Sequence, residues 1–160
     1  MRKETFLLLF ILYCCAVNAQ QPFQNNGNLR LHAGAALVCY GSMTNSSAAV
    51  LINNGDLYVK GYLANDEPAM SAGTGTLYLN GAAAQALNGT QVFKTNNLVT
   101  DNSSGITLNN DLSVGGAHTY TTGFIHSSAT PNYLIYEAGS SHSGSMLSIT
   151  VRPPCSYQST

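Results

Sequence analysis

A short unit recurs along this chain: a turn rich in Asn and Gly, followed by an apolar-x-apolar triplet. The copies, clear in the first three and looser in the rest, occupy residues 25–31, 53–59, 73–79, 104–108, 110–114 and 131–136. Apolar residues that alternate at period two between Gly and Asn predict short β-strands. We therefore expect an all-β protein.

The spacing of the copies favours one architecture. Leu29 and Leu57 are 28 residues apart, Leu57 and Leu77 are 20 apart, and Leu112 and Leu134 are 22 apart. Self-similarity near 20 residues predicts a parallel β-helix or β-solenoid, in which a coil buries its apolar side only against its neighbours. A β-sandwich is the alternative, since it also has short strands and regular turns.

The same pattern predicts which side chains face inward and why the turns look alike. The inward set is Leu29, Leu31, Leu57, Val59, Leu77, Leu79, Ile106, Leu108, Leu112, Val114, Leu134 and Tyr136. We attribute the Asn and Gly of the turns to backbone conformations of positive φ, which Gly adopts freely and Asn tolerates.

The composition is poor in charge, with 8% charged residues and a formal net charge of −1. A chain of this kind has no basic surface for nucleic acid or for a membrane. Because 44% of the residues are hydrophobic, it is not a charge-rich disordered chain either. Small uncharged residues suit stacked coils, where a repeated charge would face its own copy.

The N-terminus has the features of a secretory signal peptide. Arg2 and Lys3 precede an apolar run over 6–17, and Ala19 ends a small-residue cleavage site. Cleavage after Ala19 predicts a secreted, extracellular or cell-surface protein with no membrane span in the mature chain. The predicted organisation is a signal peptide at 1–19, a loose segment leading into the solenoid at 20–26, a solenoid at 27–144 and an atypical tail at 145–160.

The sequence lacks the motifs of the common catalytic and metal centres, so we expect a non-catalytic protein without a cofactor or bound metal. The adjacent acids Asp66 and Glu67 are interpreted as part of an exposed loop. The histidines have no metal-ligand spacing and are interpreted as scattered surface residues; they are His32, His118, His126 and His142.

Three residues and two cysteines are the candidates for contact and cross-linking. Arg30, Tyr58 and Tyr78 each occupy the middle of an apolar-x-apolar triplet and would point outward in one ladder. Such a ladder suits the apolar face of a sugar, or it is an ordinary ladder that stabilises neighbouring strands. Cys39 and Cys155 either pair as a disulfide or remain two unpaired small hydrophobes.

Residues 70–142 carry a more specific pattern: Q-x-ϕ-x-G, F-x-x-L, G-ϕ-T-L, L-x-V and T-x-G-ϕ-I, where ϕ is apolar. Its parts occupy residues 85–93, 97–99, 105–108, 112–114, 122–125 and 132–136. This stretch resembles the repeat regions of large adhesin-like surface proteins of gliding Gram-negative bacteria, which use type IX secretion. The chain departs from that pattern after His142, where a Pro-rich tail replaces further repeats and the C-terminal sorting domain.

The resemblance implies an exported, adhesin-like structural module that acts as a stalk or contact surface. Its partners would be glycans, other surface proteins, or further copies of itself joined through the solenoid ends. Two alternatives remain open. One is a remnant or homologue of a polysaccharide-acting β-helix enzyme, and the other is a truncated fragment of a larger surface protein, without independent function.

Overall fold

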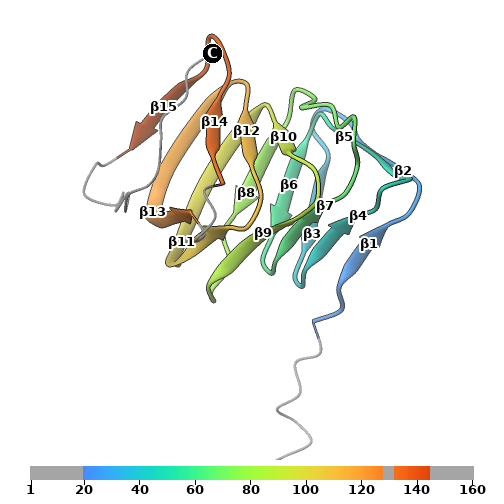
Figure 1. Ribbon diagram of the computed structural model, residues 1–160, viewed down its shortest axis with the longest axis horizontal. Helices are drawn as coiled ribbons and strands as arrows, with labels where there is room; N and C mark the ends of the chain where they lie inside the picture. Colours follow the sequence, from blue (N-terminus) through green and yellow to red (C-terminus); the bar gives the residue numbers. More distant parts are fainter. Residues whose placement is uncertain (1–19, 128–131, 145–160) are drawn as a thin grey trace, which may run out of the picture.

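Short strands wind into a β-solenoid with three faces, as the computed structural model of residues 20–127 and 132–144 shows (Figure 1). The first face contains β1 (Phe23–Asn25), β4 (Met43–Asn45), β7 (Leu63–Asn65) and β9 (Gln85–Gly89). The second contains β2 (Asn28–Leu31), β5 (Val50–Asn53), β10 (Phe93–Thr95), β12 (Leu112–Val114) and β14 (Leu134–Tyr136). The third contains β3 (Ala36–Cys39), β6 (Asp56–Val59), β8 (Thr76–Leu79) and β15 (Ser141–Gly144). Two long strands turn the corner from the third face into the first, namely β11 (Asn97–Leu108) and β13 (Ala117–Ser127).

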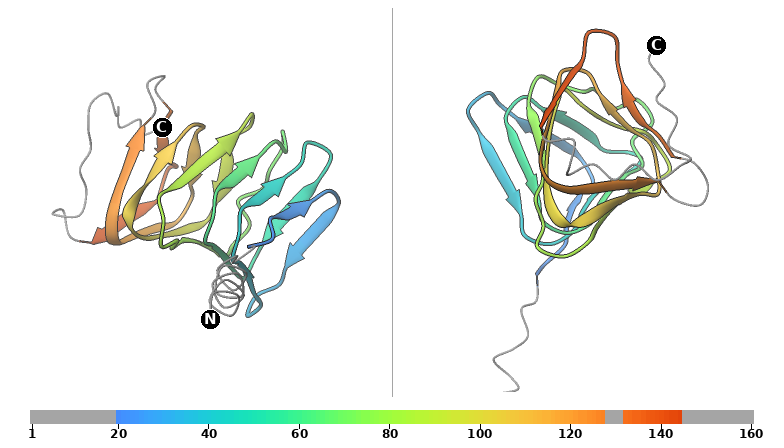
Figure 2. Two further views of the ribbon diagram at one scale, coloured as in Figure 1. Left: turned by 90° about the horizontal axis from the view of Figure 1, so that it is seen from below. Right: turned by 90° about the vertical axis from the view of Figure 1, so that its left-hand side faces the viewer.

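The pairing of the strands confirms the predicted solenoid and is not that of a sandwich. Every strand pair in the described residues is parallel, and each strand pairs with the strand at the equivalent place in the next coil. Seen along the axis, the coils enclose one core within a roughly triangular outline (Figure 2). Antiparallel sheets would be required for the sandwich alternative.

The core consists of aliphatic columns that run along the axis. Leu57 pairs with Leu77, which pairs with Leu98, and all three side chains are fully buried. Burial of one such side chain stabilises the fold by roughly 1.5–3 kcal/mol. The predicted inward set is confirmed. Three of its members, which lie in the first and last coils, are only partly buried; these are Leu29, Leu134 and Tyr136.

The length of a coil differs from the spacing that the sequence copies suggest. Leu29 pairs with Leu51 on the second face, whereas Leu57 pairs with Leu37 and Leu77 on the third. The similar units at 25–31 and 53–59 therefore contribute strands to different faces of the solenoid. Each coil contains three short strands of similar sequence, so the 28-residue spacing is one coil plus one face.

The role predicted for the turn asparagines is wrong. In the described residues only glycines have positive φ. Instead, Asn25, Asn45 and Asn65 are buried and form a ladder, in which each Nδ2 donates to the Oδ1 of the next at 2.8 Å. The ladder ends at Gly89, the register partner of Asn65, because a Cβ at Gly89 would overlap the Asn65 carbonyl oxygen. A buried carboxamide is tolerated only when hydrogen-bonded, and this stacking provides the bonds.

Glu67 is buried, so the interpretation of Asp66 and Glu67 as an exposed loop is wrong for the second acid. The segment 66–75 crosses the second face without forming a strand, between β5 and β10. Glu67 Oε2 accepts hydrogen bonds from the backbone N–H of Leu51 at 3.0 Å and from Asn45 Nδ2 at 2.7 Å. Its carboxylate thus replaces the backbone acceptor that a strand would have offered to β5.

The solenoid begins earlier than the sequence indicates. Phe23–Asn25 is strand β1 and pairs with Met43–Asn45, so this part of the segment 20–26 belongs to the first coil rather than to a loose segment before it. The sequence missed this because the strand has one apolar residue. The signal peptide with its cleavage after Ala19, the tail 145–160 and Cys155 lie outside the described residues.

Candidate contact face of the solenoid

The outer side of the third face carries the aromatic side chains in register. Its central row is Val38, Tyr58, Tyr78 and Val99, each paired with the next across one coil. A second row lies two residues further along the chain and consists of Tyr40, Lys60 and Asn80. Asp56 lies two residues before Tyr58 on the same strand. We call these eight residues the aromatic face. Strand alternation turns them outward, because their neighbours Cys39, Val59 and Leu79 point into the core. Val38 and Tyr40 are exposed, and the other six are partly buried.

Tyr58 and Tyr78 stack face to face. Their ring centroids are 4.2 Å apart and their planes differ by 11°. The predicted ladder of these two tyrosines is confirmed, but Arg30 does not belong to it. Arg30 lies on β2 of the second face and pairs with Ile52. Arg30 was assigned to the ladder because the coil length was not known, and its unit lies on a different face from the units of the two tyrosines.

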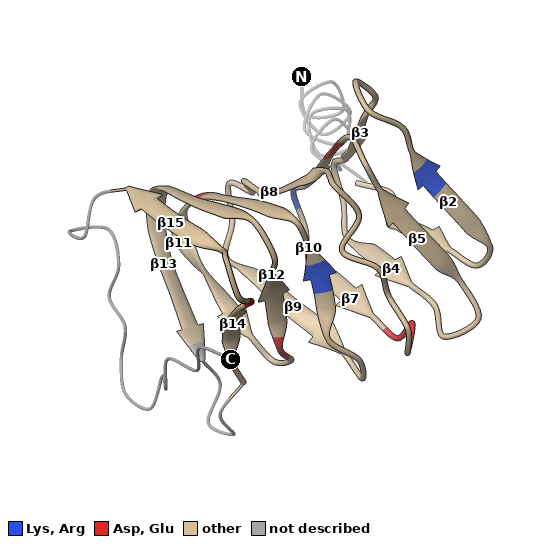
Figure 3. Ribbon diagram, turned by 90° about the horizontal axis from the view of Figure 1, so that it is seen from above, with Lys and Arg blue, Asp and Glu red and all other residues tan. Residues whose placement is uncertain are grey.

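The aromatic face contains one acidic and one basic side chain, Asp56 and Lys60, whose charges balance. Burial and then the negative charge of Asp56 raise the pKa of Tyr78, with a further contribution from Tyr58. The Lys60 ammonium donates to the backbone oxygen of Asn80 at 3.2 Å. The side-chain Oδ1 of Asn80 is buried without a hydrogen-bond partner in the described part of the chain. In Figure 3 the charged residues of the described part of the chain are distributed over several coils.

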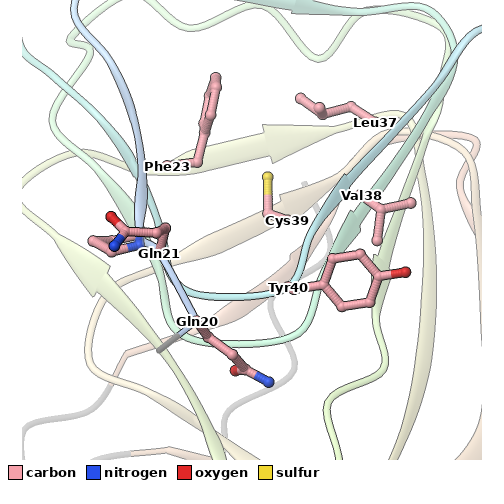
Figure 4. A pocket seen from close by; sticks show the side chains of 8 residues that line it. Gln20, Gln21, Phe23, Leu37, Val38, Cys39 and Tyr40 are labelled. Carbon is pink, nitrogen blue, oxygen red and sulfur yellow. The ribbon is translucent and has the colours of Figure 1, made fainter. Parts of the chain in front are cut away.

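A hollow of about 600 Å³ adjoins the aromatic face at the N-terminal end of the solenoid. It is lined by Gln20, Gln21, Pro22, Phe23, Leu37, Val38, Cys39 and Tyr40. In Figure 4, Leu37 and Cys39 point into the coil toward Phe23, whereas Val38 and Tyr40 project from the opposite side of β3. Val38 is 42% exposed and Tyr40 is 67% exposed. The hollow therefore joins the open end of the core to the outer row.

Cys39 is buried, has no disulfide partner among the described residues, and has a pKa raised by desolvation. Because Cys155 lies outside the described residues, pairing of the two cysteines stays a prediction. A raised pKa keeps the thiolate fraction low, so Cys39 behaves first as a small core side chain.

A polar cluster at the C-terminal end shows that the interpretation of the histidines as surface residues is wrong for His118, whereas His32 and His142 are exposed and His126 is partly buried. His118 is fully buried, with Nδ1 2.7 Å from Tyr136 Oη and Nε2 3.2 Å from Thr100 Oγ1. Tyr120 Oη lies 2.9 Å from Tyr136 Oη, and the Tyr120 ring packs on the imidazole. Burial, and then the charge of neighbouring His142, lower the pKa of His118 to about 3. His118 is therefore neutral at physiological pH and has a structural role.

The remaining titratable groups do not converge. The residues that the structure describes contain no group of three or more His, Cys, Asp or Glu side chains arranged to hold a metal ion. Within those same residues, no helix is long and apolar enough to cross a membrane. The aromatic face is thus the one surface where the predicted contact residues Tyr58 and Tyr78 come together; the sequence missed Val38, Tyr40 and Lys60, although equal spacing to the tyrosines could have found them.

In comparisons with known proteins, no protein-family model, curated protein or solved structure matches the chain.

Proposed function

We propose that this protein is an exported, non-catalytic structural module, similar to adhesin repeats, that acts as a stalk or contact surface outside the cell. The observation that carries the proposal is the third face, where six strands stack in parallel register and present an outward row of valine, tyrosine, threonine and serine. Stacked coils give a rigid and extended surface.

The chemistry of the aromatic face supports contact with saccharide rather than with a charged polymer. Tyrosine rings offer apolar surface, and Asp56, Lys60 and Thr76 offer acceptors and donors for hydroxyl groups beside them. The nearby acid and base carry opposite charges, so the face as a whole does not select an ionic ligand. Polysaccharide of a cell wall or of a neighbouring cell is the partner class that suits it.

Export and contact are tested together on the full chain, expressed with its own N-terminus in a Gram-negative host. We expect the protein outside the cytoplasm, with Gln20 as the first residue by intact mass. Beads coated with it should adhere to polysaccharide-coated surfaces, and no product should form on a panel of glycans. Retention of Met1 in the cytoplasm contradicts the proposal, and so does turnover of any glycan.

A further inference from the structure

The stacked tyrosines leave two of their four ring faces available. The facing sides of Tyr58 and Tyr78 cover each other at a centroid distance of 4.2 Å, which leaves no room for a ligand between them. The free side of Tyr58 faces the level of Val38, and the free side of Tyr78 faces the level of Val99. A valine ends at its Cγ atoms and does not reach across a tyrosine ring. A ligand that stacks on this pair therefore has two possible positions.

The two positions differ in access. Val38 belongs to β3, the edge strand of the third face, and is 42% exposed beside the hollow of about 600 Å³. Val99 is partly buried between β8 and β13, with coils on both sides. The Val38 level borders this hollow, which Val38 and Tyr40 line. The free side of the Tyr58 ring lies one coil above Val38, so ring and valine together form a step beside the hollow. We call this place the Tyr58 step.

The groups around the Tyr58 step suit an uncharged sugar ring. Tyr40 adds a second aromatic side chain, and the amides of Gln20 and Gln21 line the hollow. On the strand of Tyr58 itself, Asp56 and Lys60 lie on either side, and their opposite charges cancel. Neighbouring coils are about 4.8 Å apart, close to the stacking distance of a ring on a ring, so a pyranose on Tyr58 would occupy the level of β3.

From this geometry we propose that the Tyr58 step is a saccharide subsite, which binds a pyranose of an uncharged polysaccharide face-on against Tyr58 and above Val38. The inference rests on the proposed function and names its ligand class and its place. Amides and the Asp56–Lys60 pair would bind the ring hydroxyls, while a uronic acid would bring a carboxylate toward Asp56.

The matched pair Val38→Tyr and Val99→Tyr tests the proposal. Both substitutions extend the same outward row by one tyrosine, so both should keep or raise the melting temperature. Only Val38→Tyr fills the subsite. Binding of the full chain to cello-, laminari- and manno-hexaose is measured by calorimetry, with oligogalacturonate as the acidic comparison. We expect Val38→Tyr and Tyr58→Ala to weaken binding at least about tenfold, and Val99→Tyr to change it by no more than about twofold.

The outcomes separate this inference from the proposed function. Equal affinity of the wild-type protein and Val38→Tyr, with binding present, overturns the subsite and leaves a contact module that binds elsewhere. Stronger binding of oligogalacturonate than of the neutral hexaoses overturns the ligand class. An exported protein that adheres to polysaccharide-coated surfaces but binds none of the hexaoses overturns the inference alone, whereas failure of export overturns the proposed function.

Discussion

The two halves of the solenoid bury polar groups in different ways. In the regular coils, which we define as residues 20–79, paired residues on the first and third faces are 20 apart, as in Phe23, Met43 and Leu63. In the irregular coils, residues 85–127 and 132–144, the steps vary: Phe93 pairs with Leu112, 19 residues on, and Ala117 with Ser141, 24 residues on.

A constant period lets identical residues stack, and the regular coils use this for the asparagine ladder. A variable period prevents such repetition, so the irregular coils satisfy buried polar groups by mixed networks. Gln85 Oε1 accepts from Asn102 Nδ2 at 2.9 Å, and His118 lies between Thr100 and Tyr136. A buried polar ladder can therefore repeat only where successive coils have the same length.

The largest expected effect breaks the ladder of the regular coils. Asn45→Leu removes three hydrogen bonds, to Asn25, Asn65 and Glu67, and leaves their polar groups buried. We expect a loss of about 3–6 kcal/mol in the free energy of unfolding, measured by urea titration. Asn109→Ala is the control, because Asn109 is exposed and its side chain donates to Asn88 at the surface, and it should cost less than about 0.5 kcal/mol. Similar losses for the two variants would contradict the role of the buried ladder.

Acid should weaken the irregular coils selectively. The folded-state pKa of His118 is about 3 against 6.5 for the free side chain, so the unfolded chain binds more protons between these values. Stability contributed by neutral His118 is complete above pH 6.5 and falls as the pH falls toward 3. From pH 7 to pH 4 we expect a loss of about 3 kcal/mol.

Hydrogen exchange is the measurement for this acid effect, since it reports the two halves separately. Protection should fall first in residues 97–127 and 132–144. A His118→Gln variant should lose most of the pH dependence there, whereas exposed His32→Gln should retain it. An unchanged slope in His118→Gln would assign the acid effect to other groups.

The junction between the halves gives an intermediate effect. Gly89 has a φ of 110° and lies against the backbone of Asn65, where the ladder stops. Gly89→Ala introduces a Cβ into this contact and strains the backbone, so we expect a loss of about 2–3 kcal/mol by thermal unfolding. Gly34→Ala shares the positive φ but has open space around its Cβ, and it should cost about 1 kcal/mol. Equal losses would attribute the effect to φ alone.

The smallest effect concerns the outer surface of the regular coils. A double-mutant cycle on Tyr58→Ala and Tyr78→Ala should give a coupling energy of about 0.5–1.5 kcal/mol, because the rings stack in parallel. Tyr62→Ala with Tyr78→Ala provides the uncoupled comparison, since Tyr62 is exposed and outside the row. A coupling of zero for the stacked pair would remove stability as a reason for the row.

Much of the fold follows from alternation of apolar residues, which identifies the strands and their buried sides. The coil length does not follow from this alternation, because the three strands of a coil have similar sequences. A local pattern therefore does not identify the face on which a strand lies. For the same reason Tyr58 and Tyr78 were placed together correctly and Arg30 was not. Buried polar residues were missed for another reason: Asn25, Glu67 and His118 bond to partners 16 to 25 residues away, which only the winding of the chain supplies.

The asparagine ladder also has a direction. Asn25 and Asn45 each donate to the next asparagine toward the C-terminal end, so the amide dipoles align and polarise one another. At its start, the Oδ1 of Asn25 accepts from the backbone N–H of Gly27. A coil placed before β1 in the same sense must therefore present a donor to Asn25, and a coil turned end over end would present an acceptor. The two ends of the ladder are therefore chemically different, and only a coil stacked in the same sense extends it with donor-to-acceptor bonds.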